Sequence, residues 1–125
     1  MTRKTFTSTK ASAIGPYSHA TEAAGLVFLS GQIPLNPATS KIIEGGISAQ
    51  TQQCFDNLFA VLDAAGLKPD HVQKVNIYLR DMTDFQEMNQ VYAKQFNEPY
   101  PVRTTVGIAD LPQGALIEIE LIAAR

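Results

Sequence analysis

The sequence predicts an α+β fold in which two helices pack on one face of a sheet. Two patterns indicate this fold: apolar residues recur at three- and four-residue spacing in two segments, and they alternate with polar residues in several others. The order along the chain is strands, helix, strand, helix, strands. A chain of 125 residues with 45% hydrophobic and 18% charged residues forms one ordinary core, so residues 1–125 are predicted to be a single domain.

The first half of the chain contains a predicted hairpin and the clearer of the two helices. The hairpin spans residues 20–30 and turns near Gly25. Residues 33–37 include two prolines, which lack the backbone donor that a central strand needs, so we expect a loop or an edge there. Apolar residues share one face of a helix over residues 48–65, and Gly66 supplies its C-terminal stop.

The second half contains another helix and three strands. The helix is expected to begin near Thr83 or Asp84, either of which can cap it, and it cannot continue through Pro99. Its buried stripe is predicted to consist of Phe85, Met88, Tyr92 and Phe96. The strands are predicted where apolar and polar residues alternate, over residues 75–79, 104–108 and 117–122.

The last strand presents two carboxylates on one face, because Glu118 and Glu120 are two residues apart. The residues that alternate with them are apolar and are expected to pack under the helices. Leu116 and Ile122 flank the carboxylates on their own face. A sheet face with exposed apolar side chains of this kind favours coverage by a second subunit.

Composition and charge argue against nucleic-acid and membrane partners. The formal net charge is −2, and the 10 Lys and Arg residues are scattered, with none between Lys10 and Lys41. Nucleic-acid affinity comes mainly from clustered cations, and no such cluster occurs along the sequence. The longest apolar run covers residues 58–62 only, far less than a membrane span requires. No apolar segment follows the basic residues of the first ten positions, so no secretory signal is expected.

Common motifs for metal, nucleotide or nucleophilic chemistry are missing from the sequence. His19, His71 and Cys54 lie far apart and lack the spacing of metal ligands. The patterns GxSxG, GxGxxG and GxxxxGK[ST] do not occur. The single cysteine allows no internal disulfide and fits a reducing, cytoplasmic compartment. Its place among the core positions of the first helix predicts an inert buried thiol.

Short motifs spread over about the whole chain nevertheless occur together in one order. They are Ile14-Gly15-Pro16-Tyr17, Ser30-Gly31-Gln32-Ile33-Pro34, Ala64-Ala65-Gly66-Leu67, Asp84-Phe85 with Asn89 and Tyr92, Pro101-Val102-Arg103, Leu111-Pro112, and Ile117-Glu118-Ile119-Glu120. Each motif alone is weak, but together they are specific. This combination closely resembles the Rid family (reactive intermediate/imine deaminases, also called YjgF-like proteins), and its RidA branch in particular.

The resemblance implies a chorismate-mutase-like α+β fold with a mixed sheet. It also implies a homotrimer whose sheets line a central barrel, with sites between the subunits. The implied reaction is hydrolysis of 2-imino acids or their enamine tautomers, such as 2-aminoacrylate, 2-iminopropanoate and 2-iminobutanoate, to 2-keto acids and ammonia. Such species leak from pyridoxal-phosphate-dependent dehydratases, so the role is metabolite repair. No cofactor and no metal are implied.

The resemblance also assigns roles to particular residues. Arg103 matches the arginine that binds the substrate carboxylate, for which a planar guanidinium is suited. Glu118 matches the glutamate that activates water, and partial enclosure at an interface is expected to raise the pKa of this carboxyl. The side chains or backbone of five further residues match pocket positions: Tyr17, Ser30, Gly31, Asn89 and Tyr92. The backbone of Thr105 matches a position that contacts the substrate, whereas Glu120 is expected to be structural, either paired or lining the barrel.

The chain departs from the family pattern around Arg103. Val102 stands where alanine is commoner, and Thr104 and Thr105 replace a serine or alanine and a cysteine. Because the backbone of Thr105 makes the expected contact, the new side chain is expected to be tolerated, and substrate preference is the property that it could alter.

Three other functions remain open at this stage. A non-catalytic sensor on the same fold would bind a keto acid or another small carboxylate through Arg103, and Glu118 would matter little. Endoribonuclease activity or translation inhibition is linked with some relatives, but the acidic balance and the scattered cations disfavour it. Chorismate mutase shares only the fold, which does not determine function.

Overall fold

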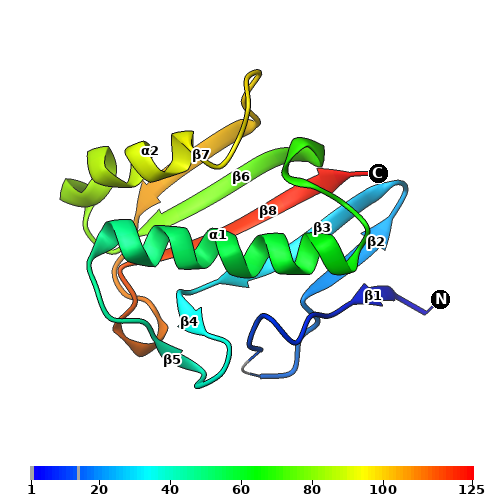
Figure 1. Ribbon diagram of the computed structural model, residues 1–125, viewed down its shortest axis with the longest axis horizontal. Coiled ribbons are helices and arrows are strands. Elements are labelled where there is room, and N and C mark those ends of the chain that lie inside the picture. Colours follow the sequence, from blue (N-terminus) through cyan, green and yellow to red (C-terminus); the bar gives the residue numbers. More distant parts are fainter. Residues whose placement is uncertain (1, 14) are drawn as a thin grey trace.

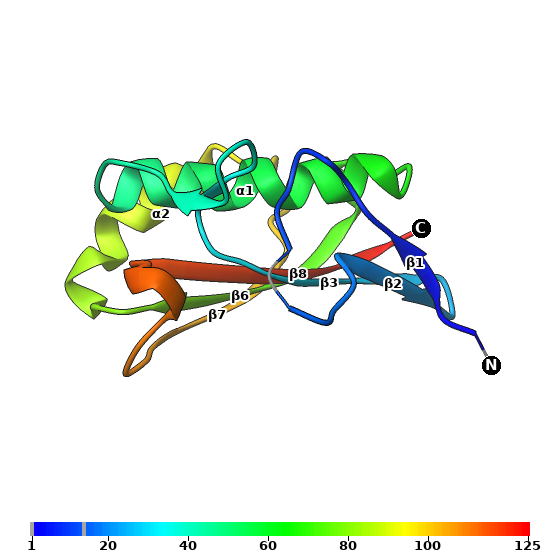
Figure 2. The same ribbon diagram turned by 90° about the horizontal axis from the view of Figure 1, so that it is seen from below.

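Two helices lie on one face of a six-stranded sheet in the computed structural model, which describes residues 2–13 and 15–125 (Figures 1 and 2). The sheet order is β1-β2-β3-β8-β6-β7, in which β6 and β7 are parallel and the other neighbours are antiparallel. Its strands are β1 (Lys4–Phe6), β2 (Ala20–Ala23), β3 (Leu26–Gln32), β6 (Val72–Leu79), β7 (Val102–Gly107) and β8 (Ile117–Ala124). The two α-helices are α1 (Ile47–Ala64) and α2 (Phe85–Ala93). The predicted α+β class, with a mixed sheet and both helices on one face, is therefore confirmed.

The strongest patterns of the sequence correspond to observed elements. The helix predicted over residues 48–65 corresponds to α1, which ends at Ala64. The alternating segments at 75–79 and 117–122 lie in β6 and β8, and the segment at 104–108 overlaps β7, which ends at Gly107. The predicted hairpin consists of β2 and β3. Its turn residues Ala24 and Gly25 have φ angles of 54° and 77°, as a two-residue turn between twisted strands requires.

Other parts of the chain differ from the prediction. The short strand β1 was not predicted, and residues 33–37 contain β4 (Leu35–Asn36), which pairs only with β5 (Lys41–Ile42) in a separate sheet. Neither Thr83 nor Asp84 supplies a side-chain cap for α2. Instead the Asp81 carboxylate accepts a hydrogen bond from the Thr83 backbone N–H, in the short 3₁₀ helix Met82–Asp84 that precedes α2.

The second helix also ends earlier than its aromatic spacing suggests. It stops at Ala93, so Phe96 lies beyond it, although this ring is buried as predicted. The Phe96 ring packs 5.7 Å from Phe55 and 5.3 Å from Tyr92, measured between ring centroids. The aromatic contacts between α1 and the α2 region therefore continue past the end of the helix.

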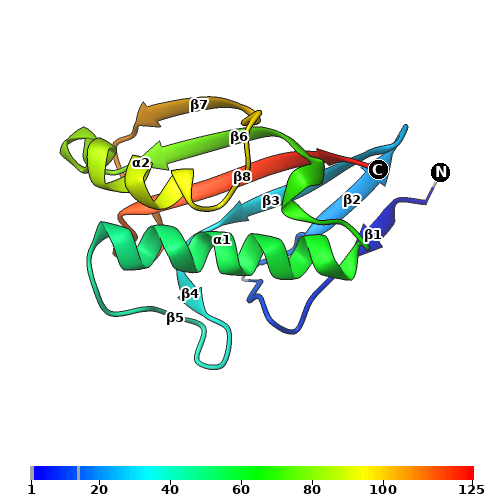
Figure 3. The same cartoon turned by 45° about the horizontal axis from the view of Figure 1, so that its top comes forward.

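The sheet has one buried and one open face, as the alternation along β8 predicted. Ile117 and Ile119 are fully buried under the helices, whereas Glu118 and Glu120 are half-buried on the opposite face. Figure 2 shows both helices on one side of the sheet, and Figure 3 shows β7 at one outer edge with β1 at the other. Several large apolar side chains are exposed along the open face: Leu26, Phe28, Val102 and Val106.

No helix in the described part of the chain is both long and apolar enough to cross a bilayer.

Candidate functional site

The two charged residues of the predicted site, Glu118 and Arg103, line two separate cavities. The first, called here the Glu118 cavity, has a volume of about 440 Å³ and is lined by Ser12, Tyr17, Ser30, Gly31, Gln32, Ile33, Leu35, Pro112, Gln113 and Glu118. The second, called the Arg103 cavity, has a volume of about 400 Å³ and is lined by Asn89, Tyr92, Ala93, Tyr100, Pro101 and Arg103. The structure therefore groups Tyr17, Ser30 and Gly31 with Glu118, and it groups Asn89 and Tyr92 with Arg103. Ile14, the first residue of one family-like motif, lies outside the described residues.

A β-bulge in β3 shapes the wall of the Glu118 cavity. Leu29 is paired with Leu121 and Gln32 with Ile119, so β3 advances three residues while β8 advances two. The extra residue lies in the Ser30-Gly31 segment. The Ser30 hydroxyl donates a hydrogen bond of 2.7 Å to the backbone oxygen of Ser18, so it secures the neighbouring loop as well as lining the cavity.

Gly31 allows the Glu118 carboxylate to approach the backbone of β3. A Cβ atom at this position would lie 2.7 Å from Oε2 of Glu118 and 3.0 Å from its Cδ. Such distances are too short for non-bonded atoms, so any larger residue would displace the carboxylate. The need for glycine here follows from this contact with Glu118.

The Glu118 carboxyl binds its proton more tightly than an ordinary glutamate does. Burial raises its pKa above the ordinary value of 4.5, and the negative charge of Glu120 raises this pKa further. A carboxyl with a raised pKa takes up and returns a proton more readily near neutral pH than an ordinary glutamate does. The shift has the expected direction, and burial within a single chain already produces it.

Contacts from α2 fix the orientation of Arg103. Its Nη1 donates a hydrogen bond of 2.7 Å to Oδ1 of Asn89, and its guanidinium carbon lies 4.6 Å from the ring centroid of Tyr92. The ring of Phe85 is 5.6 Å from the same carbon. Because Asn89 takes one of five donors, the guanidinium can still bind a carboxylate through two parallel hydrogen bonds.

Two residues that line the Arg103 region were not predicted as site residues. Phe85 packs against the guanidinium, and Tyr100 lines the cavity with an exposed side chain. Phe85 was expected only in the buried stripe of the helix. The position of Tyr100 between two prolines near Arg103 is the only sequence signal that pointed to it.

Two residues near Arg103, Tyr92 and Thr105, have buried hydroxyl groups. The hydroxyl of Tyr92 and the Oγ1 of Thr105 are both inaccessible and have no hydrogen-bond partner among the described residues. Burial is also the main cause that raises the pKa of Tyr92. Thr105 lines neither cavity. It lies on β7, the edge strand of the six-stranded sheet in the described part of the chain.

Arg103 and Glu118 lie on opposite faces of the sheet. Arg103 is paired with Val75, which is fully buried under the helices, whereas Glu118 is paired with Tyr78. Paired residues of neighbouring strands point to the same face, and residues 75 and 78 of one strand point to opposite faces. One chain therefore cannot bring the guanidinium and the carboxylate to the same small substrate.

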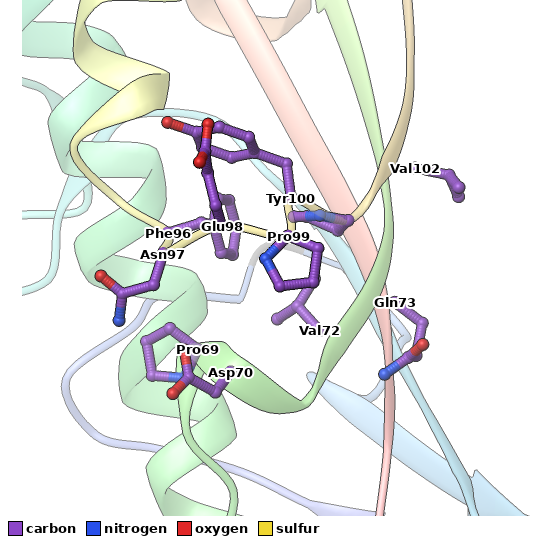
Figure 4. A pocket seen from close by; sticks show the side chains of 11 residues that line it. Pro69, Asp70, Val72, Gln73, Phe96, Asn97, Glu98, Pro99, Tyr100 and Val102 are labelled. Atoms are coloured by element: carbon purple, nitrogen blue, oxygen red, sulfur yellow. The ribbon is translucent and has the colours of Figure 1, made fainter.

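A separate cavity, of about 390 Å³, lies between the start of β6 and the segment that joins α2 to β7 (Figure 4). It contains none of the predicted site residues, and the charged residues in its wall are Asp70 and Glu98. Two carboxylates repel an anionic ligand, so this cavity does not suit a small carboxylic acid.

The described residues contain no group of three or more His, Cys, Asp or Glu side chains placed to hold a metal ion. Cys54 is fully buried, as predicted, and its thiol donates a hydrogen bond of 3.2 Å to the backbone oxygen of Gln32. Burial raises the pKa of this thiol well above 9.0, and the charge of Glu118 contributes. A thiol in this state is a poor nucleophile.

Comparison with known proteins agrees with the motifs and the fold. The sequence model of a family described as Endoribonuclease L-PSP matches residues 7–125. A 2-iminobutanoate/2-iminopropanoate deaminase of Dermatophagoides farinae is 46% identical over 109 residues, which cover 87% of this chain and 85% of that protein.

Solved structures show the same similarity in three dimensions. The crystal structure of RidA from the Antarctic bacterium Psychrobacter sp. has a TM-score of 0.94 at 40% identity and covers 98% of this chain and 100% of its own. That of E. coli TdcF with bound serine has a TM-score of 0.92 at 36% identity and covers 98% of both chains. The chain therefore belongs to the Rid (YjgF-like) family.

Proposed function

We propose that this protein hydrolyses 2-imino acids, or their enamine tautomers, to 2-keto acids and ammonia in sites formed between the subunits of a homotrimer. The observation that carries the proposal is the separation of Arg103 and Glu118 onto opposite faces of one sheet. A substrate that needs both residues must lie between two chains. The exposed apolar side chains of the open face, such as Phe28 and Val106, are the surface that a neighbouring subunit would cover.

The two cavities have the complementary charges that such a shared site needs. Arg103 is the cationic residue in the wall of one, and Glu118 is the anionic residue in the wall of the other. The guanidinium would bind the substrate carboxylate, which places the imine carbon toward the Glu118 carboxylate of the neighbouring subunit. The serine bound to the similar protein TdcF is also a small molecule with a carboxylate and a nitrogen atom, which supports a substrate of this class.

In the proposed reaction Glu118 accepts a proton from a water molecule as the water oxygen bonds to the imine carbon, and it passes this proton to the imine nitrogen. The resulting tetrahedral species carries a hydroxyl and an amino group on that carbon. Transfer of the hydroxyl proton to nitrogen through Glu118 breaks the carbon–nitrogen bond, so ammonia leaves and the 2-keto acid remains. The raised pKa of Glu118 suits a group that first takes up and then returns a proton. Because imines hydrolyse unaided, orientation of the substrate and of one water molecule accounts for most of the required acceleration.

The electrostatics of these cavities favour a small acid over RNA, despite the description of the family's sequence model. Among the described residues, Arg103 is the only charged one in the wall of the Arg103 cavity, and the Glu118 cavity presents a carboxylate. RNA binding depends on several cations that neutralise successive phosphates. One guanidinium beside a carboxylate suits a ligand with a single acidic group.

A coupled assay tests the proposal. Threonine dehydratase and threonine generate 2-aminocrotonate and its imine in solution, and the release of 2-ketobutyrate is followed with and without this protein. We expect faster release in its presence and a trimeric mass by light scattering. A folded trimer that does not accelerate release would contradict the deaminase proposal and would favour the non-catalytic carboxylate sensor.

Gly31→Ala is expected to lower kcat/KM for the imino acid by about 100-fold, because the new methyl group displaces the Glu118 carboxylate. The displaced atoms belong to the end of a flexible side chain, so Tm should change little. The measurements are kcat/KM in the coupled assay and Tm by calorimetry.

Gly46→Ala is the matched control for this variant. A Cβ atom at Gly46 would meet nothing within 4 Å, so activity should persist there. Full activity of Gly31→Ala would show that the position of Glu118 beside Gly31 is unimportant for the reaction.

A further inference from the structure

The open face of the sheet carries a second carboxylate, Glu120, that the proposed reaction does not use. Glu120 lies two residues from Glu118 on β8, and the Tyr78 hydroxyl on the neighbouring strand β6 donates a hydrogen bond to its Oε1. In the sheet register Tyr78 is paired with Glu118, not with Glu120. The tyrosine side chain therefore extends diagonally from its position opposite one carboxylate to bind the other.

This hydrogen bond also favours the protonated form of the Tyr78 hydroxyl. It raises the pKa of Tyr78 to about 12, with smaller contributions from burial and from the charges of Glu120 and Glu118. The hydroxyl is therefore a protonated hydrogen-bond donor at neutral pH. A donor that does not titrate keeps the Glu120 carboxylate in one orientation.

Glu120 is the neighbouring group that acts on Glu118 through its charge. Titratable groups approach Glu118 from several elements: Glu120 on β8, Tyr78 on β6, Cys54 on α1 and Tyr17 in the cavity wall. Among them the charge of Glu120 raises the pKa of Glu118, in addition to the effect of burial. The two carboxylates share one face of one strand, so this repulsion follows from the alternation of side chains along β8.

We propose that Tyr78 and Glu120 form a positioning pair for Glu118, in which the tyrosine hydroxyl fixes a negative charge beside the carboxylate that activates water. The catalytic consequence rests on the proposed function, but the physical interaction does not. Glu120, which was expected to be structural and either paired or lining the barrel, is hydrogen-bonded to Tyr78. The inference gives that pair a role in setting the pH range of the reaction.

The test compares Glu120→Gln, Tyr78→Phe and the double variant with the wild type. Carbon-13 NMR follows the titration of the Glu118 carboxyl in each protein, and the pH profile of kcat is measured in parallel. Glu120→Gln should move the Glu118 midpoint and the acidic limb of the profile to lower pH, because the neighbouring charge is lost. Tyr78→Phe should move the midpoint in the wild type but not in the Glu120→Gln background, because Tyr78 acts through Glu120.

Glu44→Gln is the matched control, since it removes one negative charge from an exposed residue. An unchanged Glu118 midpoint in folded Glu120→Gln, or an equal shift in Glu44→Gln, would overturn the inference. The NMR titration needs no substrate. A wild-type protein without deaminase activity would therefore contradict the proposed function, whereas the titrations would still decide whether the pair acts on Glu118.

Discussion

Arg103→Ala is expected to lower kcat/KM for a 2-imino acid by two to three orders of magnitude. Loss of one partner from an enclosed, hydrogen-bonded charge pair costs roughly 2–5 kcal/mol, and each 1.36 kcal/mol corresponds to about a tenfold change. The guanidinium is held by Asn89 and by the Tyr92 ring, 4.6 Å from its central carbon, so the substrate carboxylate meets a preoriented group. The coupled dehydratase assay measures this loss directly.

Arg103→Lys separates the effect of charge from the effect of geometry. Lysine keeps the positive charge, but it cannot offer two parallel donors or stack flat against Tyr92. We expect an intermediate loss that appears mainly as an increase in KM. Lys41→Ala is the control, because it removes an exposed cation that lines neither cavity. Wild-type kinetics in folded Arg103→Ala would exclude Arg103 from substrate binding.

Sequence patterns predicted on which face of the sheet Glu118 lies, but they did not predict that Arg103 lies on the opposite face. Alternation along residues 117–122 correctly placed the Glu118 carboxylate on the face away from the helices, because side chains of a strand alternate with a period of two. No such pattern placed Arg103 relative to Glu118. Their relation depends on which residue of β6 each is paired with, Val75 for Arg103 and Tyr78 for Glu118. Register between distant segments is a property of the folded sheet, so it could not be derived from either segment alone.

The errors in the fold prediction have a similar cause. The strand β1 has only three residues, and it exists because Lys4–Phe6 pairs with β2. Phe96 has the spacing of a helical residue relative to Tyr92, yet it is buried by ring contacts after the helix has ended. For Phe96, local periodicity reports burial well. It does not report whether the backbone that delivers the buried residue is helical.

Glu118→Gln is expected to be nearly inactive and yet more stable than the wild type at neutral pH. A positioned general base contributes about 10²–10⁴ to a rate, so kcat should fall by that factor while KM changes little. The gain in stability has an independent cause. Burial and the charge of Glu120 both disfavour the charged form of Glu118, as its raised pKa shows. A neutral amide of nearly the same shape relieves both effects.

The raised pKa of Glu118 also determines how the difference in stability between Glu118→Gln and the wild type changes with pH. Because the pKa of Glu118 in the folded protein lies above the ordinary value of 4.5, the folded state binds this proton more tightly than the unfolded chain. The stability that the protonated carboxyl confers is therefore lost as pH rises through the raised pKa. The excess Tm of Glu118→Gln over the wild type should be largest at neutral pH and should disappear as the pH falls to the ordinary value.

Calorimetry across this pH range, combined with the coupled assay, separates loss of chemistry from loss of structure. Glu44→Gln makes the same chemical change at an exposed position, and neither its activity nor its Tm should change appreciably. A Glu118→Gln protein that is less stable than the wild type at neutral pH would show that the carboxylate makes a favourable contact in the assembled protein. Retained activity would support the carboxylate sensor instead. Reduced activity together with increased Tm cannot arise from unfolding. That combination would show that the charge of Glu118 is needed for the reaction and destabilises the folded protein.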